Sequence, residues 1–278
     1  MNPEASAPLV TACVPTWNAA SFIERTLESL AAQTYPRLRI LVSDDASTDS
    51  TAAICERFAA ADARFRVIRQ PVRHGWVGNT NATLRAAEGD YLMIAAHDDH
   101  PMPTYVERLV EPLQRNRQAV LAFSDIEAIY PDGRREARVY SDLDGVRSPI
   151  ERARRLLAQS AYWSTPYRGV FRAAVVARIG GLRRHAAGEI SADWPWLVHL
   201  ALLGEFVRIP ECLLIKNYRA ESITRSWNFG LRSWLAVAGS CAREIRRSDL
   251  RMAEEIPLYL QIARRARKKL RYRIRPAH

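Results

Sequence analysis

Two pairs of adjacent aspartates follow two apolar stretches of the chain. They are Asp98-Asp99, after residues 91–96, and Asp44-Asp45, after residues 38–43. Adjacent carboxylates at the end of a strand suit a hard divalent cation, which is commonly shared with phosphate oxygens. Two strands of one open sheet that both end in carboxylates form a crevice at the carboxyl edge of the sheet, where α/β folds bind nucleotides. The alternative is that these aspartates are turn or helix-cap residues, positions that aspartate favours.

The first 125 residues alternate between short apolar runs and segments with helical spacing. We expect strands at 9–14, 39–43, 65–69, 91–95 and 120–124, and helices at 22–33, 51–60, 79–87 and 104–116. Strands that alternate with helices of this length predict βαβ units and a mostly parallel sheet.

After residue 125 this rhythm changes. Turn residues 130–133 predict a hairpin between strands at 127–129 and 134–139. Further helices are expected at 149–160, 173–179 and 192–203, and short strands at 205–209 and 213–218. The last sixty residues are expected to be helical. Without a repeat or a low-complexity linker, the two halves are expected to pack as one unit.

Composition restricts the class of protein. The chain has 278 residues, of which 48% are hydrophobic, enough for one large core. No apolar stretch approaches the ~18 residues that span a bilayer, and residues 1–8 do not have the pattern of a signal peptide. We therefore expect a disordered lead and a cytoplasmic protein. The four cysteines are far apart in the sequence, so reduced, unpaired thiols are expected rather than a zinc site.

The net charge of +11 is concentrated near the C-terminus, where residues 264–275 carry eight basic side chains and no acid. A solvated helix, contact with anionic lipid and contact with nucleic acid are the three interpretations. The apolar residues Ile256, Leu258, Leu260 and Ile262 precede the cluster, which favours lipid over nucleic acid. Since no nucleic-acid recognition module is recognisable, we predict no nucleic-acid partner, and peripheral contact with the inner face of the membrane.

Four motifs occur in a fixed order along the chain. They are Pro15-Thr16-Trp17-Asn18, Asp44-Asp45, His97-Asp98-Asp99, and a later acidic segment that contains Glu189 and Asp193. In this order they resemble the family 2 inverting glycosyltransferases over about residues 9 to 220. The resemblance implies the GT-A fold, an α/β architecture with a mostly parallel nucleotide-binding sheet flanked by helices. It divides the chain into a nucleotide-sugar half (9–125), a mixed acceptor-binding half (126–220) and a helical basic extension (221–278).

The resemblance also implies which residues hold the nucleotide of the donor. They are Pro15, Thr16, Trp17, Asn18, Asp44, Asp45, Asn81 and Arg219. Trp17 stands where the family places an aromatic ring against the base, and the alternative is a core tryptophan. Ala46 replaces a family glycine, and Thr80 replaces an arginine that often precedes Asn81. Glu221 falls near a family histidine that follows the position of Arg219.

The metal motif departs from the family pattern. Many relatives have Asp-x-Asp-Asp after this strand, whereas this chain has Ala96-His97-Asp98-Asp99. The resemblance still implies Mg²⁺ or Mn²⁺ bound by Asp98 and Asp99, with the diphosphate completing the shell. His97 is either a further ligand or a packing residue.

Asp193 is the candidate catalytic base. It fits the acidic position that the family has at the start of a helix beside the acceptor, although Ala192 replaces the usual preceding glutamate. Displacement at an anomeric carbon needs a group that removes the proton of the acceptor hydroxyl. The alternatives are that Asp193 only caps the helix, or that nearby Glu189 is the base. Residues 167–169 are expected to line the acceptor pocket.

The sequence therefore predicts a metal-dependent inverting glycosyltransferase that moves a sugar from a nucleoside-diphosphate donor to a hydroxyl of a glycan or lipid-linked glycan. A degenerate domain that binds a nucleotide or glycan without catalysis is the main alternative. A sugar-phosphate nucleotidyltransferase is a weaker one, since residues 15–18 are not a glycine-rich basic loop. A nucleic-acid-binding module would rest on the basic tail alone.

Overall fold

The computed structural model describes residues 7–159, 164–219, 227 and 229–274. The strands are β1 (Val10–Thr16), β2 (Leu38–Asp44), β3 (Phe65–Arg69), β4 (Tyr91–Ile94), β5 (Asp99–Pro101), β6 (Ala119–Ile129), β7 (Arg135–Arg138), β8 (Val170–Arg172) and β9 (Glu205–Asn217). The helices are α2 (Ile23–Ala31), α3 (Thr51–Ala61), α4 (Gly75–Ala86), α5 (Tyr105–Arg115), α6 (Pro149–Ala158), α7 (Ala173–Ile179), α8 (Asp193–Leu203), α9 (Leu231–Arg246) and α10 (Met252–Ile274), with a 3₁₀ turn η1 (Pro166–Arg168).

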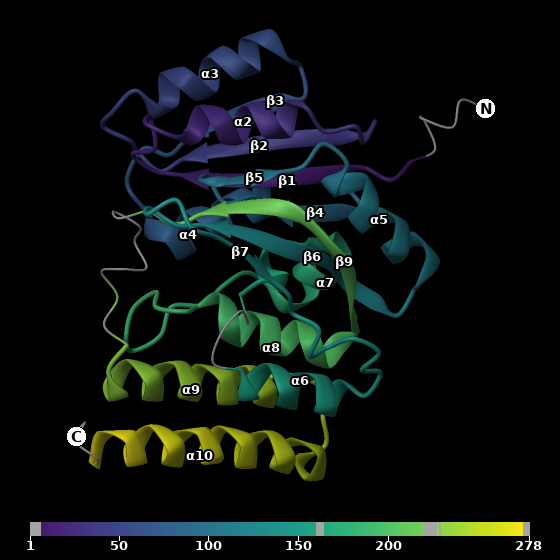
Figure 1. Cartoon of the computed structure of the whole chain (residues 1–278), viewed down its shortest axis with the longest axis vertical. Helices are drawn as coiled ribbons and strands as arrows, with labels where there is room; N and C mark the ends of the chain where they lie inside the picture. The colour runs from purple at the N-terminus through teal and green to yellow at the C-terminus, as the bar shows by residue number, and fades with distance from the viewer. Residues whose placement is uncertain (1–6, 160–163, 220–226, 228, 275–278) are drawn as a thin grey trace.

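The described strands form one sheet in the order β3-β2-β1-β4-β8-β6-β9-β5, with β7 paired to β6 (Figure 1). β1, β2, β3 and β4 pair in parallel, so that Thr16 lies beside Asp44 at the carboxyl edge. β8 pairs antiparallel with β4 and β6, whereas β9 pairs parallel with β6. This confirms the predicted α/β class, with a parallel first half and a mixed second half.

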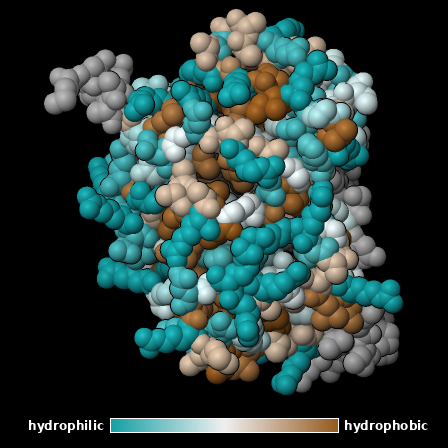
Figure 2. All heavy atoms as spheres, turned by 180° about the vertical axis from the view of Figure 1, so that it is seen from behind, coloured by the Kyte–Doolittle hydropathy of each residue, from teal (hydrophilic) through white to brown (hydrophobic). Residues whose placement is uncertain are grey.

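Burial explains why the first strands form. Val10, Ala12 and Val14 of β1 are completely buried, as expected for a parallel strand that helices cover on both faces. On α5, Val106, Leu109 and Leu113 recur at helical spacing and are also completely buried. Figure 2 shows that apolar side chains form small patches among hydrophilic ones on the face seen from behind.

Several boundaries differ from the predictions. β9 is one continuous strand rather than two, because an irregularity in its pairing with β6 accommodates Pro210 between Ile209 and Cys212. β5 and β8 were not predicted, since three residues are too few to show a period. α4 begins at Gly75, four residues before the predicted start. The predicted lead falls largely on residues 1–6, outside the described residues.

The C-terminal helices form a layer with α6 and α8 beyond the sheet (Figure 1). α9 packs on α8, and α10 packs on α6 and α9. His199 Nδ1 of α8 lies 2.8 Å from the Glu244 carboxylate of α9, which also pairs with Arg183 Nε at 3.1 Å. This buried polar contact fixes α9 against the helix that begins at Asp193. No helix within the described residues is long and apolar enough to cross a bilayer.

We expect Gly169→Ala to destabilise the protein. A Cβ atom at Gly169 would collide with the carbonyl oxygen of Ala122 and the side chain of Leu121. Overpacking of this kind costs about 1–3 kcal/mol, or about 2–12 °C in Tm. The control is Gly239→Ala inside α9, where a Cβ meets no atom within 4 Å, so the unfolding free energy should not fall. Thermal unfolding followed by circular dichroism measures both, and equal Tm values would contradict the close packing at Gly169.

Candidate active site

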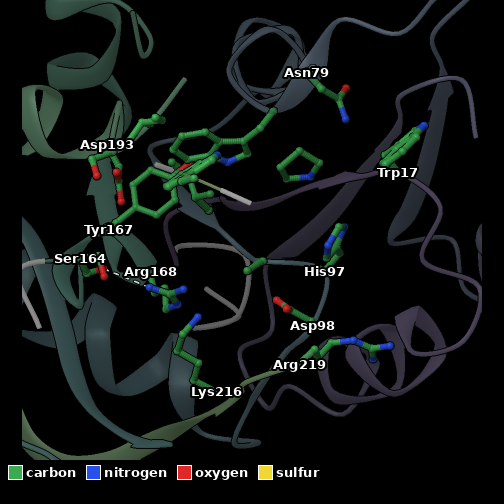
Figure 3. Close-up of a pocket in the computed structure, with 18 of the residues that line it drawn as sticks. Trp17, Asn79, His97, Asp98, Ser164, Tyr167, Arg168, Asp193, Lys216 and Arg219 are labelled. Carbon is green, nitrogen blue, oxygen red and sulfur yellow. Dashed lines mark hydrogen bonds between the residues drawn. The ribbon is translucent and has the colours of Figure 1, made fainter. Parts of the chain in front are cut away.

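A cavity of about 1060 Å³ opens at the carboxyl edge of the parallel strands (Figure 3). Its walls come from the ends of β1, β2 and β4, from η1, from the start of α8, and from α9 and α10. In the view of Figure 3, Trp17 and Asp193 lie at opposite sides, and Asp98, Lys216 and Arg168 lie between them. The cavity therefore brings together residues from distant parts of the chain.

One end of the cavity is formed by the predicted motif after β1. Pro15, Thr16, Trp17 and Asn18 all line the cavity. Trp17 is 36% exposed, and the Arg73 guanidinium lies 3.5 Å from the centre of its ring. Trp17 is thus a cavity residue rather than a core tryptophan, and Arg73 is a partner that the sequence did not reveal.

The loop after β2 is held by hydrogen bonds to Asn18. The backbone N–H of Asn18 donates to Ser47 Oγ at 2.9 Å. The side-chain Oδ1 of Asn18 accepts a hydrogen bond from the backbone N–H of Thr48 at 2.9 Å. Ala46 has a φ of 55°, a conformation that favours glycine. This is the position at which the family pattern has a glycine, so the backbone keeps its shape although the residue differs.

The two aspartates after β2 have different surroundings. Both oxygens of Asp45 accept backbone amides, from His74 at 2.7 Å and Gly75 at 2.8 Å, and Asp45 lines the cavity. Asp44 is buried, accepts from the Ser47 amide at 3.2 Å and does not line the cavity. The geometry therefore supports a ligand contact for Asp45, and a role in loop structure for Asp44.

The asparagine of α4 that faces the cavity is Asn79, not the predicted Asn81. Asn81 exchanges two hydrogen bonds of 2.8 Å with the backbone of Leu182, away from the cavity. Asn79 lines the cavity and donates to the carbonyl oxygen of Ser43 at 2.8 Å. The early start of α4, which the sequence pattern did not indicate, places Asn79 beside the strand ends.

The two aspartates after β4 also differ in their surroundings. Asp98 is half-buried and lines the cavity, whereas Asp99 forms a buried ion pair with Arg168 and lies 3.9 Å from Lys216 Nζ. Burial alone would raise the pKa of Asp99, but Arg168 and Lys216 outweigh burial and hold this pKa below its usual value. The Asp99 carboxylate is therefore engaged by cations rather than directed into the cavity.

Of the two aspartates after β4, Asp98 is the one whose carboxylate is available to a metal ion in the cavity. Within the described ranges, no three His, Cys, Asp or Glu side chains form a group that could hold a metal. Mg²⁺ is commonly held by one or two carboxylates together with substrate phosphates, so Asp98 alone fits such an ion when a diphosphate is bound. His97 lines the cavity beside Asp98, and burial lowers its pKa, which favours the neutral imidazole that binds metals.

Positive side chains surround Asp98. Lys216, Arg168 and Arg219 line the cavity, and Figure 3 shows them on the same side as Asp98. The Arg219 guanidinium lies 3.6 Å from the centre of the Phe22 ring. Burial and then the charge of Arg168 lower the pKa of Lys216. Glu221, predicted beside Arg219, lies outside the described residues. These cations make the middle of the cavity attractive to an anion.

Asp193 is the first residue of α8 and lines the cavity at the end away from Trp17. Its side chain is buried, its Oδ1 has no hydrogen-bond partner among the described residues, and burial raises its pKa to about 7. The N-cap of α8 is Ala192, so Asp193 is not the cap of this helix. Glu189 instead accepts the Trp76 and Val77 amides at 3.1 and 3.2 Å, which commits it to the start of α4.

Aromatic side chains from several segments line the cavity. They include Trp76, Tyr167, Trp194, Trp227, Phe229 and Trp234. The Trp76 ring lies 6.1 Å from Tyr167 and 5.7 Å from Trp227, between ring centres. Tyr167 and Arg168 were expected here, whereas the tryptophans of other segments carried no sequence signal for this site.

A mixed α/β sheet with a large cavity at the carboxyl edge of its parallel strands is the architecture of the GT-A class of glycosyltransferases. Residues 11–176 match the family described as "Glycosyl transferase family 2". This range is more than half of the chain, and the chain therefore belongs to glycosyltransferase family 2. The predicted fold and family are confirmed.

The matches to these individual relatives cover a smaller part of the chain than the family match does. The chain is similar to glycosyltransferase GlyG of Streptococcus pneumoniae, with 31% identity over 38% of this chain and 35% of the relative. Alignments with curated relatives from Haemophilus influenzae and Bacillus subtilis cover 38% and 32% of those proteins. The chain thus spans about a third of the length of these relatives.

Solved structures agree with the fold. S. aureus TarS in complex with UDP-GlcNAc matches with a TM-score of 0.72 and 20% identity, over 91% of this chain and 71% of that chain. The mannosyltransferase PcManGT of Pyrobaculum calidifontis, in complex with GDP-Man and Mn²⁺, matches with a TM-score of 0.62 and 18% identity, over 93% of this chain and 70% of that chain. At these identities the likeness shows the fold alone.

Asp98 and Asp99 are expected to differ in their effect on stability. Asp99→Asn leaves Arg168 and Lys216 buried without their acid, which costs about 3–5 kcal/mol and lowers Tm by about 6–20 °C. Asp98→Asn removes a carboxylate without a salt bridge to a described residue, so Tm should change by about 2 °C or less. Thermal unfolding of both variants without added metal or nucleotide is the measurement. Equal Tm values would contradict the ion pair of Asp99.

Proposed function

We propose that this chain is a metal-dependent inverting glycosyltransferase that uses a nucleoside-diphosphate sugar and a glycan or lipid-linked glycan acceptor. One observation carries the proposal. A single cavity contains the exposed ring of Trp17 at one end, the buried carboxylate of Asp193 at the other, and Asp98 among cations in the middle. This is the order in which a nucleoside, a diphosphate, a sugar and an acceptor hydroxyl are arranged in such a reaction.

The donor is held by the ends of β1 and β2. Trp17 offers a ring face to the base, and Asp45 offers carboxylate oxygens to the base or ribose. Lys216 and Arg219 lie where they can contact phosphate oxygens, in addition to any metal ion. Because TarS binds UDP-GlcNAc and PcManGT binds GDP-Man, a UDP- or GDP-sugar is the proposed donor.

Asp193 removes the proton in the transfer step. The acceptor oxygen forms a bond to the anomeric carbon on the face opposite the diphosphate, and the bond from that carbon to the phosphate oxygen breaks. The proton moves to Asp193, and the diphosphate leaves with the bonding electrons. A carboxylate with a pKa of about 7 is well matched to accept this proton near neutral pH.

Charge develops on the diphosphate as it leaves. A Mg²⁺ or Mn²⁺ ion held by Asp98, with His97 beside it, would offset this charge. Lys216 and Arg219 add positive charge from the protein itself, and Arg168 keeps Asp99 occupied. These side chains stabilise the charge that develops on the departing diphosphate. They need no rearrangement to do so, because they are in position before the reaction begins.

A non-catalytic nucleotide-binding domain is the second candidate. It is favoured by one observation, the absence of the first acid of the metal motif at Ala96. Such a domain would bind the donor and would show no turnover. A buried carboxylate with a raised pKa at the cavity wall is costly to keep without a function, and this favours the catalytic proposal.

Asp193→Asn is expected to lower the rate of nucleoside-diphosphate release from the donor by about 10²–10⁴-fold, because the base is lost. Binding of UDP or GDP, measured as a thermal shift with Mn²⁺, should remain. In the wild type the rate should rise with pH up to about 7 and then level off, since Asp193 acts only after it loses its proton.

The matched control is Asp132→Asn in the turn between β6 and β7, which should keep the wild-type rate. Chelation of the metal with EDTA should remove the nucleotide shift. A wild-type chain that binds the nucleotide without any turnover would support the non-catalytic domain instead. If Asp193→Asn retains the wild-type rate and pH profile, the assignment of the base is wrong.

We also propose that α10 contacts an anionic membrane surface. Met252, Ile256 and Leu260 are exposed at intervals of four residues, so they share one face of the helix. Leu258, which the sequence placed in the same apolar set, is buried instead. The exposed Arg264 continues the helix towards the basic end, and a mixed apolar and basic face complements anionic lipid headgroups.

The double variant Ile256→Ser and Leu260→Ser is expected to weaken binding to vesicles containing 30% phosphatidylglycerol by at least tenfold, because two apolar side chains no longer enter the interface. Co-sedimentation measures the partition. Val72→Ser is the control, since Val72 is equally exposed but lies in the loop after β3. The contact is contradicted if the chain binds neutral vesicles as tightly as anionic ones. It is also contradicted if the chain does not bind the anionic vesicles.

A further inference from the structure

The acceptor end of the cavity is completed by helices that lie outside the range matched by the family. Ser233, Trp234 and Val237 of α9 line the cavity together with Arg265 of α10. The family match ends at residue 176. The family match therefore does not account for these residues, and their chemistry describes what this end of the cavity accepts.

Arg265 is a partly buried cation without a carboxylate partner. Its guanidinium lies 4.2 Å from the centre of the Trp194 ring, and Nη1 donates to the carbonyl oxygen of Leu157 at 2.9 Å. No described acid lies within 4 Å of it, whereas the buried Arg168 pairs with Asp99. Burial lowers the pKa of Arg265 to about 10, as expected for a charge that has lost water without gaining an acid.

A buried donor without a partner among the described residues also lines the cavity. The Trp234 side chain is 7% exposed, and its indole N–H has no hydrogen-bond partner among the described residues. Buried donors are usually satisfied, so an unpaired one beside a cavity indicates a group that arrives with a ligand. Two donors, one of them positively charged, favour a ligand oxygen that carries negative charge.

Arg265 contacts the residue next to Asp193, the proposed base. Trp194, over which the guanidinium lies, directly follows Asp193 in the first turn of α8. A negative group bound at Arg265 would thus belong to the molecule whose hydroxyl Asp193 deprotonates. Aromatic rings supply flat apolar surfaces against which the rest of that molecule can pack.

We propose that Arg265, with Trp234, binds a phosphate or carboxylate group of the acceptor, so that the acceptor is an anionic glycan or glycan phosphate. This inference rests on the proposed function and names the acceptor class of that site. The guanidinium is suited to both groups, because its N–H fork pairs with two oxygens at once.

The test is direct binding to the full chain, measured by quenching of tryptophan fluorescence without nucleotide. The probes are glucose, glucuronic acid and glucose 1-phosphate. We expect at least one anionic sugar to bind at least tenfold more tightly than glucose. Arg265→Gln should remove this preference and leave glucose binding unchanged, while Arg265→Lys should retain part of it. Tight binding of only one anionic sugar identifies phosphate or carboxylate as the group.

The matched control is Arg264→Gln, since Arg264 is exposed on the same helix and does not line the cavity. It should keep the wild-type preference, which separates a local contact from general attraction to a basic helix. The Arg265 variants also separate this site from phosphate binding near Lys216. If Arg265→Gln lowers Tm, the test can be made on the wild type instead. There, 500 mM NaCl should weaken the binding of the anionic sugars and leave the binding of glucose unchanged.

The inference is overturned if glucose and the anionic sugars bind equally, or if Arg265→Gln keeps the preference. Neither result affects the donor site, which the nucleotide thermal shift tests independently. Conversely, a wild-type chain that shows the Arg265-dependent preference but no nucleotide shift would contradict the proposed function and leave an anion site in place.

Discussion

The buried ion pair between Asp99 and Arg168, with Lys216 beside it, organises the centre of this protein. The three residues come from β5, from η1 and from β9, and they are far apart in the sequence. Since a buried charge is tolerated best when it is paired, the Asp99 carboxylate favours the arrangement of these elements that brings both cations to it. That arrangement joins the segment that follows β4 to η1 and to β9 of the second half.

The same charges shape the chemistry on both sides of them. Asp99 is withdrawn from the cavity, which leaves Asp98 as the carboxylate among cations. Arg168 and Lys216 also act electrostatically on Asp193, where they oppose the effect of burial on its pKa. The pKa of Asp193 and the positive charge at the centre of the cavity thus depend on one buried cluster.

The sequence predicted the elements that have a period, and missed the contacts that depend on folding. β1 to β4 were found because each is an apolar run between helical segments, and the motif at Trp17 follows directly from β1. The pairing of Asp99 with Arg168 joins residues 69 positions apart, so no local pattern could separate Asp99 from Asp98. The choice of Asn79 over Asn81 depended on the start of α4, and the ends of helices are the least certain part of a sequence prediction.

The contact between His199 and Glu244 has a consequence for how this cavity can vary among related chains. It ties α9 to the helix that begins at Asp193, although the family range ends well before either residue. The C-terminal helices are therefore part of the cavity wall rather than a separate appendage. Exchange of this segment between homologues would change the cavity wall around Trp234 and Arg265 while Trp17 and Asp45 stay in place, so separate stretches of one gene can vary different parts of one cavity.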